Sequence, residues 1–294
     1  MLLPYNLVPL TMHVRPTHRE PPDMDGTFLN ASGQLSARNV QMAAELERRG
    51  VHFAIATGRP AAALQPLIDG IGLPSLAAIT FNGACLQVAR PHLPSTPLWQ
   101  HTLDAQQAHK IVAMCDEHLG LGISYSTRSA AIFLARTTAQ RRLLATYERL
   151  EGVPQDRIIS SVDDLPASDV DLPLKILALT ETPDAHAEEA RRALQGSGVH
   201  VIAAEMHIEF VDQAVNKAAA IERLCEISCV PLTSVVAFGD AMNDVEMLGR
   251  VGLGVAMQNA RDAVKAAADE TCAYTNDQDG VARKCEELIA YGKL

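Results

Sequence analysis

The stretch V-V-A-F-G-D-A-M-N-D, residues 235–244, joins a short apolar run to a polar cluster. Four apolar residues in a row are typical of a strand that is covered on both faces. Similar runs occur at 51–56, 76–81 and 253–257, and amphipathic segments with helical spacing alternate with them. Such alternation predicts a parallel sheet with right-handed crossovers. The predicted fold class is therefore α/β, with a Rossmann-like parallel-sheet core.

The middle of the chain has a different texture, with long helical stretches and strand-like runs between residues 86 and 210. This pattern predicts a second α/β domain inserted into the first. The core would then comprise residues 1–85 and 211–294, with an atypical segment at 1–22, and the insertion would comprise residues 86–210.

Composition limits the function. The 294 residues include 25 Lys and Arg against 35 Asp and Glu, a net charge of −10. This balance argues against a general nucleic-acid binder, which needs positive charge to displace phosphate counterions. No apolar run approaches the roughly 18 residues of a membrane helix, so no membrane partner is expected. A poor secretory signal and six scattered cysteines, expected as buried thiols, favour a cytoplasmic protein.

Four polar segments stand at or just beyond the carboxyl ends of the predicted core strands, where open α/β sheets bind ligands. They are residues 23–27, residues 57–59, Lys217 and residues 239–244. Four carboxylates gathered at one rim repel one another unless a cation lies among them, and Mg²⁺ prefers such oxygen ligands. A carboxylate can also attack phosphorus while a second one transfers the proton. The carboxylates concerned are Asp23, Asp25, Asp240 and Asp244.

Taken in order, D-M-D-G-T-F-L-N, T-G-R, a lone lysine and G-D-x-x-N-D resemble the haloacid dehalogenase superfamily of phosphohydrolases, in its Cof-like branch with an inserted cap. The resemblance covers residues 23–294 and includes Asn82-Gly83-Ala84, Asn259-Ala260 and Asp279-Gly280-Val281. It implies a core of that superfamily's fold and a cap that closes over the site and selects the substrate.

The same resemblance implies a role for each matching residue. The nucleophile would be Asp23 and the general acid/base Asp25. Phosphate would be bound by Thr57, Gly58, Lys217 and Asn243, of which Asn243 could contact Lys217 instead. Mg²⁺ would be held by Asp23, by the Asp25 carbonyl and by Asp240, with support from Asp244.

Each motif also has a plainer interpretation. Residues 23–26 could form a surface turn, residues 240–244 a helix cap, and Lys217 a solvated residue at a helix start. Arg59 could equally be a surface cation or a functional group. His207 beside Glu209 is more often structural than catalytic in such a pattern.

One segment departs from the family pattern. Residues 15–22, R-P-T-H-R-E-P-P, precede the predicted nucleophile where a buried central strand is expected. Prolines remove ladder donors, and charged side chains would face buried helices. Three explanations are open: residues 1–22 are not part of the natural product, the strand is rebuilt from residues 7–14, or the nucleophile site is damaged. We favour the first.

The sequence as a whole predicts a cytosolic, Mg²⁺-dependent phosphatase that acts on small phosphorylated metabolites, either sugar phosphates or phosphorylated cofactors. One alternative is a phosphomutase, which shares the first half-reaction. The other is a catalytically impaired protein that binds phosphorylated ligands. No motif names the substrate, and the oligomeric state is left open.

Overall fold

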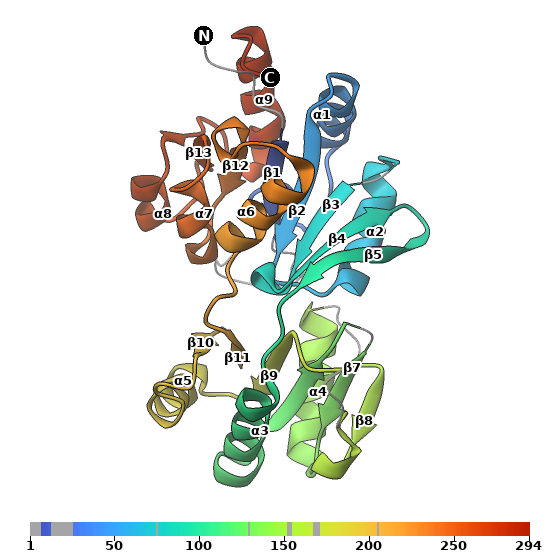
Figure 1. Cartoon of the computed structure of the whole chain (residues 1–294), viewed down its shortest axis with the longest axis vertical. Helices are drawn as coiled ribbons and strands as arrows, with labels where there is room; N and C mark the ends of the chain where they lie inside the picture. Colours follow the sequence, from blue (N-terminus) through green and yellow to red (C-terminus); the bar gives the residue numbers. More distant parts are fainter. Residues whose placement is uncertain are drawn as a thin grey trace. The chain divides into compact units, whose positions relative to one another are not determined.

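The computed structural model describes residues 7–12, 26–74, 76–128, 130–151, 155–166, 171–204 and 206–294. The chain divides into two compact units (Figure 1). The core unit comprises Met1–Trp99 and Asn216–Leu294, and the inserted unit comprises Gln100–Val215. Within the described ranges, no helix has the length and apolar character that crossing a membrane requires.

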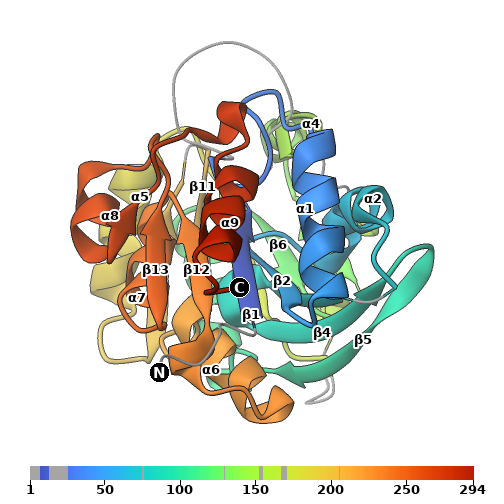
Figure 2. The same cartoon turned by 90° about the horizontal axis from the view of Figure 1, so that it is seen from above.

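The core unit is built on an eight-stranded sheet with the order β14-β13-β12-β1-β2-β3-β4-β5 (Figure 2). Neighbouring strands are parallel from β14 to β3, and β4 runs antiparallel to β3. The strands are β1 (Leu7–Met12), β2 (His52–Thr57), β3 (Leu76–Thr80), β4 (Cys85–Arg90), β5 (Leu93–Gln100), β12 (Val236–Gly239), β13 (Leu253–Ala256) and β14 (Glu270–Thr271).

Helices of the core unit form two groups of packed neighbours, as in a sheet with helices on both faces. Ser36 caps α1, accepting a hydrogen bond from the amide of Asn39, as its position predicts. One group is α1 (Ala37–Arg48), α2 (Ala61–Ile71) and α9 (Gly280–Ala290); the other is α6 (Lys217–Ser228), α7 (Val245–Leu248) and α8 (Asp262–Ala267).

Strand β1 occupies the centre of the sheet, parallel to both β12 and β2. Met12 is in register with Thr57, the last residue of β2. The described part of the apolar run at 7–14, Leu7–Met12, therefore supplies the central strand, in line with the second of our three explanations. Residues 13–25 lie outside the described part of the chain. Our favoured explanation stays a prediction, which peptide analysis of the native N-terminus can test.

The first junction between the units differs from the predicted one. We placed it at residues 85/86, whereas the core unit continues to Trp99. The reason is that β4 pairs with β3 and, with β5, extends the core sheet. The second junction follows Val215 instead of residue 210.

The inserted unit has a six-stranded sheet with the order β10-β11-β9-β6-β7-β8. All neighbouring pairs in it are antiparallel except β7 and β8. Its elements are α3 (Ala105–Ala113), β6 (Gly122–Ser126), β7 (Ala131–Leu134), α4 (Thr138–Glu151), β8 (Arg157–Ile159), β9 (Lys175–Leu179), α5 (Pro183–Ala193), β10 (Val199–Ala203) and β11 (His207–Asp212).

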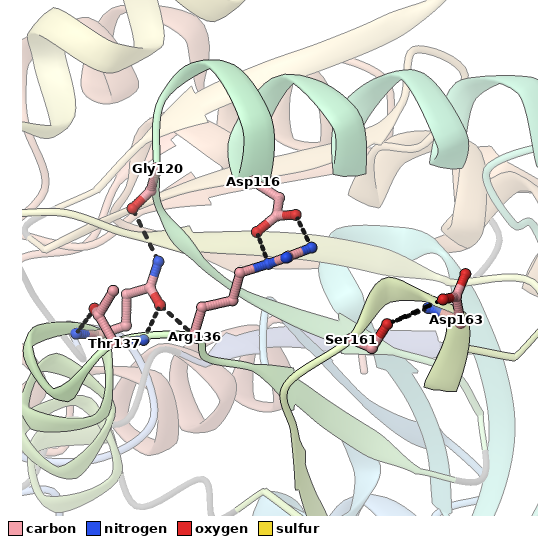
Figure 3. A network of polar contacts seen from close by, with 7 residues as sticks. Asp116, Gly120, Arg136, Thr137, Ser161 and Asp163 are labelled. Carbon is pink, nitrogen blue, oxygen red and sulfur yellow. Dashed lines mark hydrogen bonds and ion pairs between the residues drawn. The ribbon is translucent and has the colours of Figure 1, made fainter.

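A polar network ties the end of α3 to the beginning of α4 (Figure 3). Arg136 donates two hydrogen bonds to the carboxylate of Asp116, at 2.8 and 2.6 Å. The side-chain nitrogen of Gln140 donates to the Gly120 carbonyl at 2.9 Å, and its oxygen accepts from the Arg136 amide. Because charged bidentate pairs fix direction as well as distance, this network sets the path of the chain between the two helices.

A buried ionic cluster lies on β9 and β11. Lys175 Nζ donates to Glu209 Oε1 at 2.7 Å, and His207 Nε2 lies 3.3 Å from the same oxygen. The ring of Tyr147 meets the His207 ring edge-on, with centroids 5.6 Å apart. Burial acts to raise the pKa of Glu209, but the charge of Lys175 and the hydrogen bonds from His207 and Lys175 outweigh it and hold that pKa well below its usual range.

This cluster makes the stability of the protein dependent on pH. The lowered pKa of Glu209 contributes stability above its unfolded-state pKa, and this stability is lost as the pH falls towards the folded-state value. Wild-type stability should therefore decline below about pH 4.5. At pH 7, Glu209→Gln should cost about 3–5 kcal/mol, because it removes the charged carboxylate that accepts from the buried Lys175 ammonium group.

Calorimetric unfolding of the whole chain from pH 7 to pH 3 measures both effects. The matched control is Glu189→Gln, which removes an exposed carboxylate facing His118 in the same unit and should change stability by less than about 0.5 kcal/mol. If Glu209→Gln were as stable as wild type at pH 7, the cluster would not stabilise the fold.

Candidate active site

The structure describes most of the predicted site residues. Asp23 and Asp25 lie outside the described part of the chain. The other six belong to the core unit and lie at or next to the carboxyl ends of β2 and β12 and the first turn of α6. They are Thr57, Gly58, Lys217, Asp240, Asn243 and Asp244.

The turn after β12 is organised around Asp244. One oxygen of its carboxylate, Oδ2, accepts hydrogen bonds from the amides of Asp240 and Ala241, both at 3.0 Å. Gly239 permits this turn, since a Cβ atom there would lie 2.6 Å from the Cβ of Asp244. The carboxylate of Asp244 thus fixes the backbone that carries Asp240.

Lys217 is the first residue of α6 and is not solvated. Its side chain is 1% exposed, as is that of Asp244, and its Nζ donates to Asp244 Oδ1 at 2.7 Å. The helix start is fixed by Asn216, whose side chain accepts from the Ala219 amide at 2.7 Å. A buried lysine needs a charged partner, and Asp244 provides it. The interpretation of Lys217 as a solvated surface residue is wrong.

Asp240 lies against the segment that follows the predicted nucleophile. The side chain of Thr27 donates to Asp240 Oδ1, and Asp240 is 5% exposed. Gly26 comes so close that a Cβ atom there would lie 2.2 Å from Asp240 Oδ2. Asn259 Nδ2 donates to the Gly26 carbonyl at 2.7 Å and holds this approach in place. Residues 213 positions apart in the chain therefore meet here.

The close approach gives a test of the site. Gly26→Ala should lower kcat/KM for a phosphate ester by about 10²-fold, since displacing a catalytic group by about 1 Å has an effect of that size. Gly70→Ala is the control, because a Cβ atom at Gly70 would meet its nearest neighbour at an ordinary 3.5 Å. Steady-state kinetics of both variants decides, and wild-type kinetics for Gly26→Ala would show that residue 26 is not part of the site.

The other predicted phosphate ligands lie at the end of β2 and in the turn after β12. Thr57 is fully buried, and its hydroxyl oxygen accepts from the Arg59 amide at 3.2 Å. Asn243 Nδ2 donates to Asn82 Oδ1 at 3.0 Å. Hydroxyl, amide and ammonium groups, as in Thr57, Asn243 and Lys217, are donors of the kind that stabilise an oxyanion.

Sequence reasoning gave no role to Thr27, Asn82 or Asn259. Thr27 contacts Asp240, Asn82 contacts Asn243, and Asn259 holds Gly26. The motifs Asn82-Gly83-Ala84 and Asn259-Ala260 were the available signal, since both stood out as marks of the family without an assigned function.

The predicted metal site can be judged from its donor atoms. Among described residues, no group of three or more His, Cys, Asp or Glu side chains is placed to hold a metal ion. Both oxygens of Asp244 are engaged, by Lys217 and by two backbone amides. Asp240, a predicted metal ligand, has the carboxylate oxygens that a hard cation prefers.

Known proteins of one family are similar to this chain. The family model of haloacid dehalogenase-like hydrolases matches residues 22–284. A 5-amino-6-(5-phospho-D-ribitylamino)uracil phosphatase of Bacillus subtilis is 28% identical over 91% of this chain and 96% of its own length. A pyridoxal phosphate phosphatase of Escherichia coli is 28% identical over 84% of this chain and 90% of its own.

A solved structure of a haloacid dehalogenase-like hydrolase from B. subtilis has a TM-score of 0.75, with 24% identity over 96% of this chain and 99% of that one. At this identity the likeness concerns the fold, and it confirms the predicted α/β class. The predicted enzyme class, a phosphoric monoester hydrolase, agrees with the names of the two relatives. The chain belongs to the haloacid dehalogenase-like hydrolases.

Proposed function

We propose that this protein is a Mg²⁺-dependent phosphatase that hydrolyses small phosphorylated metabolites through an aspartyl-phosphate intermediate. The observation that carries the proposal is the buried Lys217–Asp244 pair, with Asp240 beside it at the end of β12. Burying an ammonium group costs free energy, and buried charged groups of this kind cluster at functional sites. The positive charge of Lys217 is suited to binding the phosphate group of a substrate.

In the first step, a carboxylate oxygen of Asp23 attacks phosphorus and forms a phosphorus–oxygen bond. The bond from phosphorus to the leaving oxygen breaks, and Asp25 gives that oxygen its proton. In the second step, Asp25 takes a proton from water, the water oxygen attacks phosphorus, and the bond to Asp23 breaks. Inorganic phosphate is released, and both carboxyl groups return to their starting states.

The phosphoryl oxygens carry the negative charge that must be stabilised during transfer. Lys217 provides a positive charge, and the Thr57 hydroxyl, the Gly58 amide and the Asn243 side chain provide hydrogen-bond donors. Asp244 acts through other residues, since its carboxylate holds Lys217 and the backbone at Asp240.

Asp23, the Asp25 carbonyl and Asp240 would hold Mg²⁺, with Asp244 supporting Asp240. Bound Mg²⁺ offsets the negative charge of the carboxylates and of the phosphate group. The position of Gly26 against Asp240 supports this ligand set, because Asp25 is bonded to Gly26 and consecutive Cα atoms are about 3.8 Å apart.

The names of two relatives support a substrate class. One acts on a phosphorylated ribitylaminouracil and one on pyridoxal phosphate, both phosphate esters of small polar heterocycles. We place the present substrate in the same broad class, together with sugar phosphates, and assign its selection to the inserted unit.

The cysteines support a cytoplasmic location. The six free cysteines, five of them buried, fit a reducing cytoplasm.

Phosphate release from an aryl phosphate, sugar phosphates, pyridoxal phosphate and the ribitylaminouracil phosphate tests the proposal. Turnover should need Mg²⁺, stop with EDTA and return when Mg²⁺ is added in excess. A product that retains the phosphate would identify a phosphomutase instead. A folded protein that binds inorganic phosphate without turnover would be the catalytically impaired binding protein.

A further inference from the structure

The turn between β3 and β4, residues Phe81–Gly83, has an unusual backbone. Phe81 and Asn82 have φ values of +52° and +57°, in the left-handed region. Non-glycine residues are uncommon there, and asparagine is among those that adopt it most readily. Asn82 is also 8% exposed. A buried, left-handed asparagine persists only where surrounding contacts hold it, which makes its partners informative.

The first partner is the loop that carries Thr57 and Gly58. The Phe81 amide donates to the Arg59 carbonyl at 3.1 Å. A Cβ atom at Gly58 would lie 3.0 Å from Asn82 Oδ1, so the asparagine side chain lies directly against the Gly58 backbone. The turn therefore contacts this loop through its backbone and through a side chain.

The second partner is Asn243. Its Nδ2 donates to Asn82 Oδ1 at 3.0 Å. Its Oδ1 is buried and has no hydrogen-bond partner among the described residues. Because the Asn82 oxygen can only accept, it orients the Asn243 amide with the nitrogen towards the turn. A predicted phosphate ligand is thus held in one orientation by a residue outside the predicted site.

The third partner is the start of α6. Gly83 has a φ of +114°, and a Cβ atom there would lie 2.3 Å from the Asn216 carbonyl oxygen. Asn216 caps the helix that begins with Lys217. The turn therefore touches the backbone that presents this lysine, as well as the Gly58 loop and Asn243.

We infer that Asn82 is a positioning residue for the phosphate-binding groups, acting through Gly58 and Asn243. This inference rests on the proposed function. A single short turn contacts three segments that are far apart in the sequence and that are all predicted to bind the same phosphate. The side-chain oxygen of Asn82 contacts two of these segments, the Gly58 loop and Asn243.

Asn82→Gly tests the inference, since glycine keeps the left-handed backbone and removes the side chain. With an aryl phosphate and Mg²⁺, kcat/KM should fall about 10²-fold, and the inhibition constant of inorganic phosphate should rise. The double variant Asn82→Gly with Asn243→Ala should lose less activity than the product of the two single losses, because both changes remove the contact between Asn82 and Asn243. His92→Gly is the control, a left-handed residue in the exposed hairpin between β4 and β5.

All rates are measured where thermal unfolding shows each variant to be folded. If Asn82→Gly is less stable but keeps the wild-type kcat/KM and phosphate inhibition constant, the role of Asn82 is merely structural. The same conclusion holds if the loss of kcat/KM in the double variant equals the product of the two single losses. If neither wild type nor His92→Gly releases phosphate, the proposed function fails. In that case the inference is tested by calorimetric binding of inorganic phosphate. Weaker binding by Asn82→Gly than by wild type supports it, and equal affinity overturns it.

Discussion

Replacing Asp23 with asparagine is expected to lower kcat for phosphate release by about 10⁴- to 10⁶-fold, the range found when a catalytic nucleophile is removed. The carboxamide has nearly the same shape as the carboxylate but is a poor nucleophile and carries no charge. Folding should therefore be unaffected while the first step is blocked. Steady-state phosphate release, with labelled phosphate trapped on the peptide containing residue 23 in the wild type, measures the effect.

Asp262→Asn is the matched control for this substitution. Asp262 lies in the first turn of α8 and is exposed, so its replacement should leave the rate unchanged. This test has particular value here because the approach to Asp23 departs from the family pattern at residues 15–22. Wild-type rates for Asp23→Asn would mean that another group attacks phosphorus.

The second large effect concerns the buried pair of Lys217 and Asp244. Asp244→Ala is expected to lower the free energy of unfolding by about 3–5 kcal/mol and to abolish turnover. The substitution leaves the ammonium group buried without its partner and removes the acceptor of the Asp240 and Ala241 amides. Denaturant unfolding and phosphate release, measured on the same preparation, give both quantities.

Lys217→Met should also abolish turnover but should destabilise the protein less. The Asp244 carboxylate keeps its two backbone amides in that variant, so its charge is still partly compensated. Glu226→Ala, which breaks an exposed ion pair with Arg223 on the same helix, should cost less than about 1 kcal/mol. Losses from Asp244→Ala as small as this control would show that the buried pair does not stabilise the fold.

Local sequence features predicted much of the core. Short apolar runs fixed the positions of β2, β3, β12 and β13, because a strand covered on both faces must be apolar throughout. The ends of these runs also located the polar segments of the site, since parallel strands bring their carboxyl ends to one edge of the sheet.

Pairing between strands could not be predicted in the same way. We assigned residues 86–99 to the insertion, whereas they belong to the core unit. The sequence of an antiparallel hairpin does not show which of two sheets the hairpin joins. Only the pairing of β4 with β3 places it in the core sheet. Likewise, a central strand from the apolar run at 7–14 was one of three alternatives, and the pairing of Leu7–Met12 with β2 and β12 makes that segment the central strand.

The sequence by itself thus determined the α/β class and the family, and it predicted the residues of the site. The tertiary structure decided which of these residues are buried and what each one contacts. Lys217 pairs with Asp244, Thr27 reaches Asp240, and Asn82 orients Asn243. The physical reason is that apolar patterns and motifs are local features of the chain, whereas these contacts join segments that meet only once the sheet has formed.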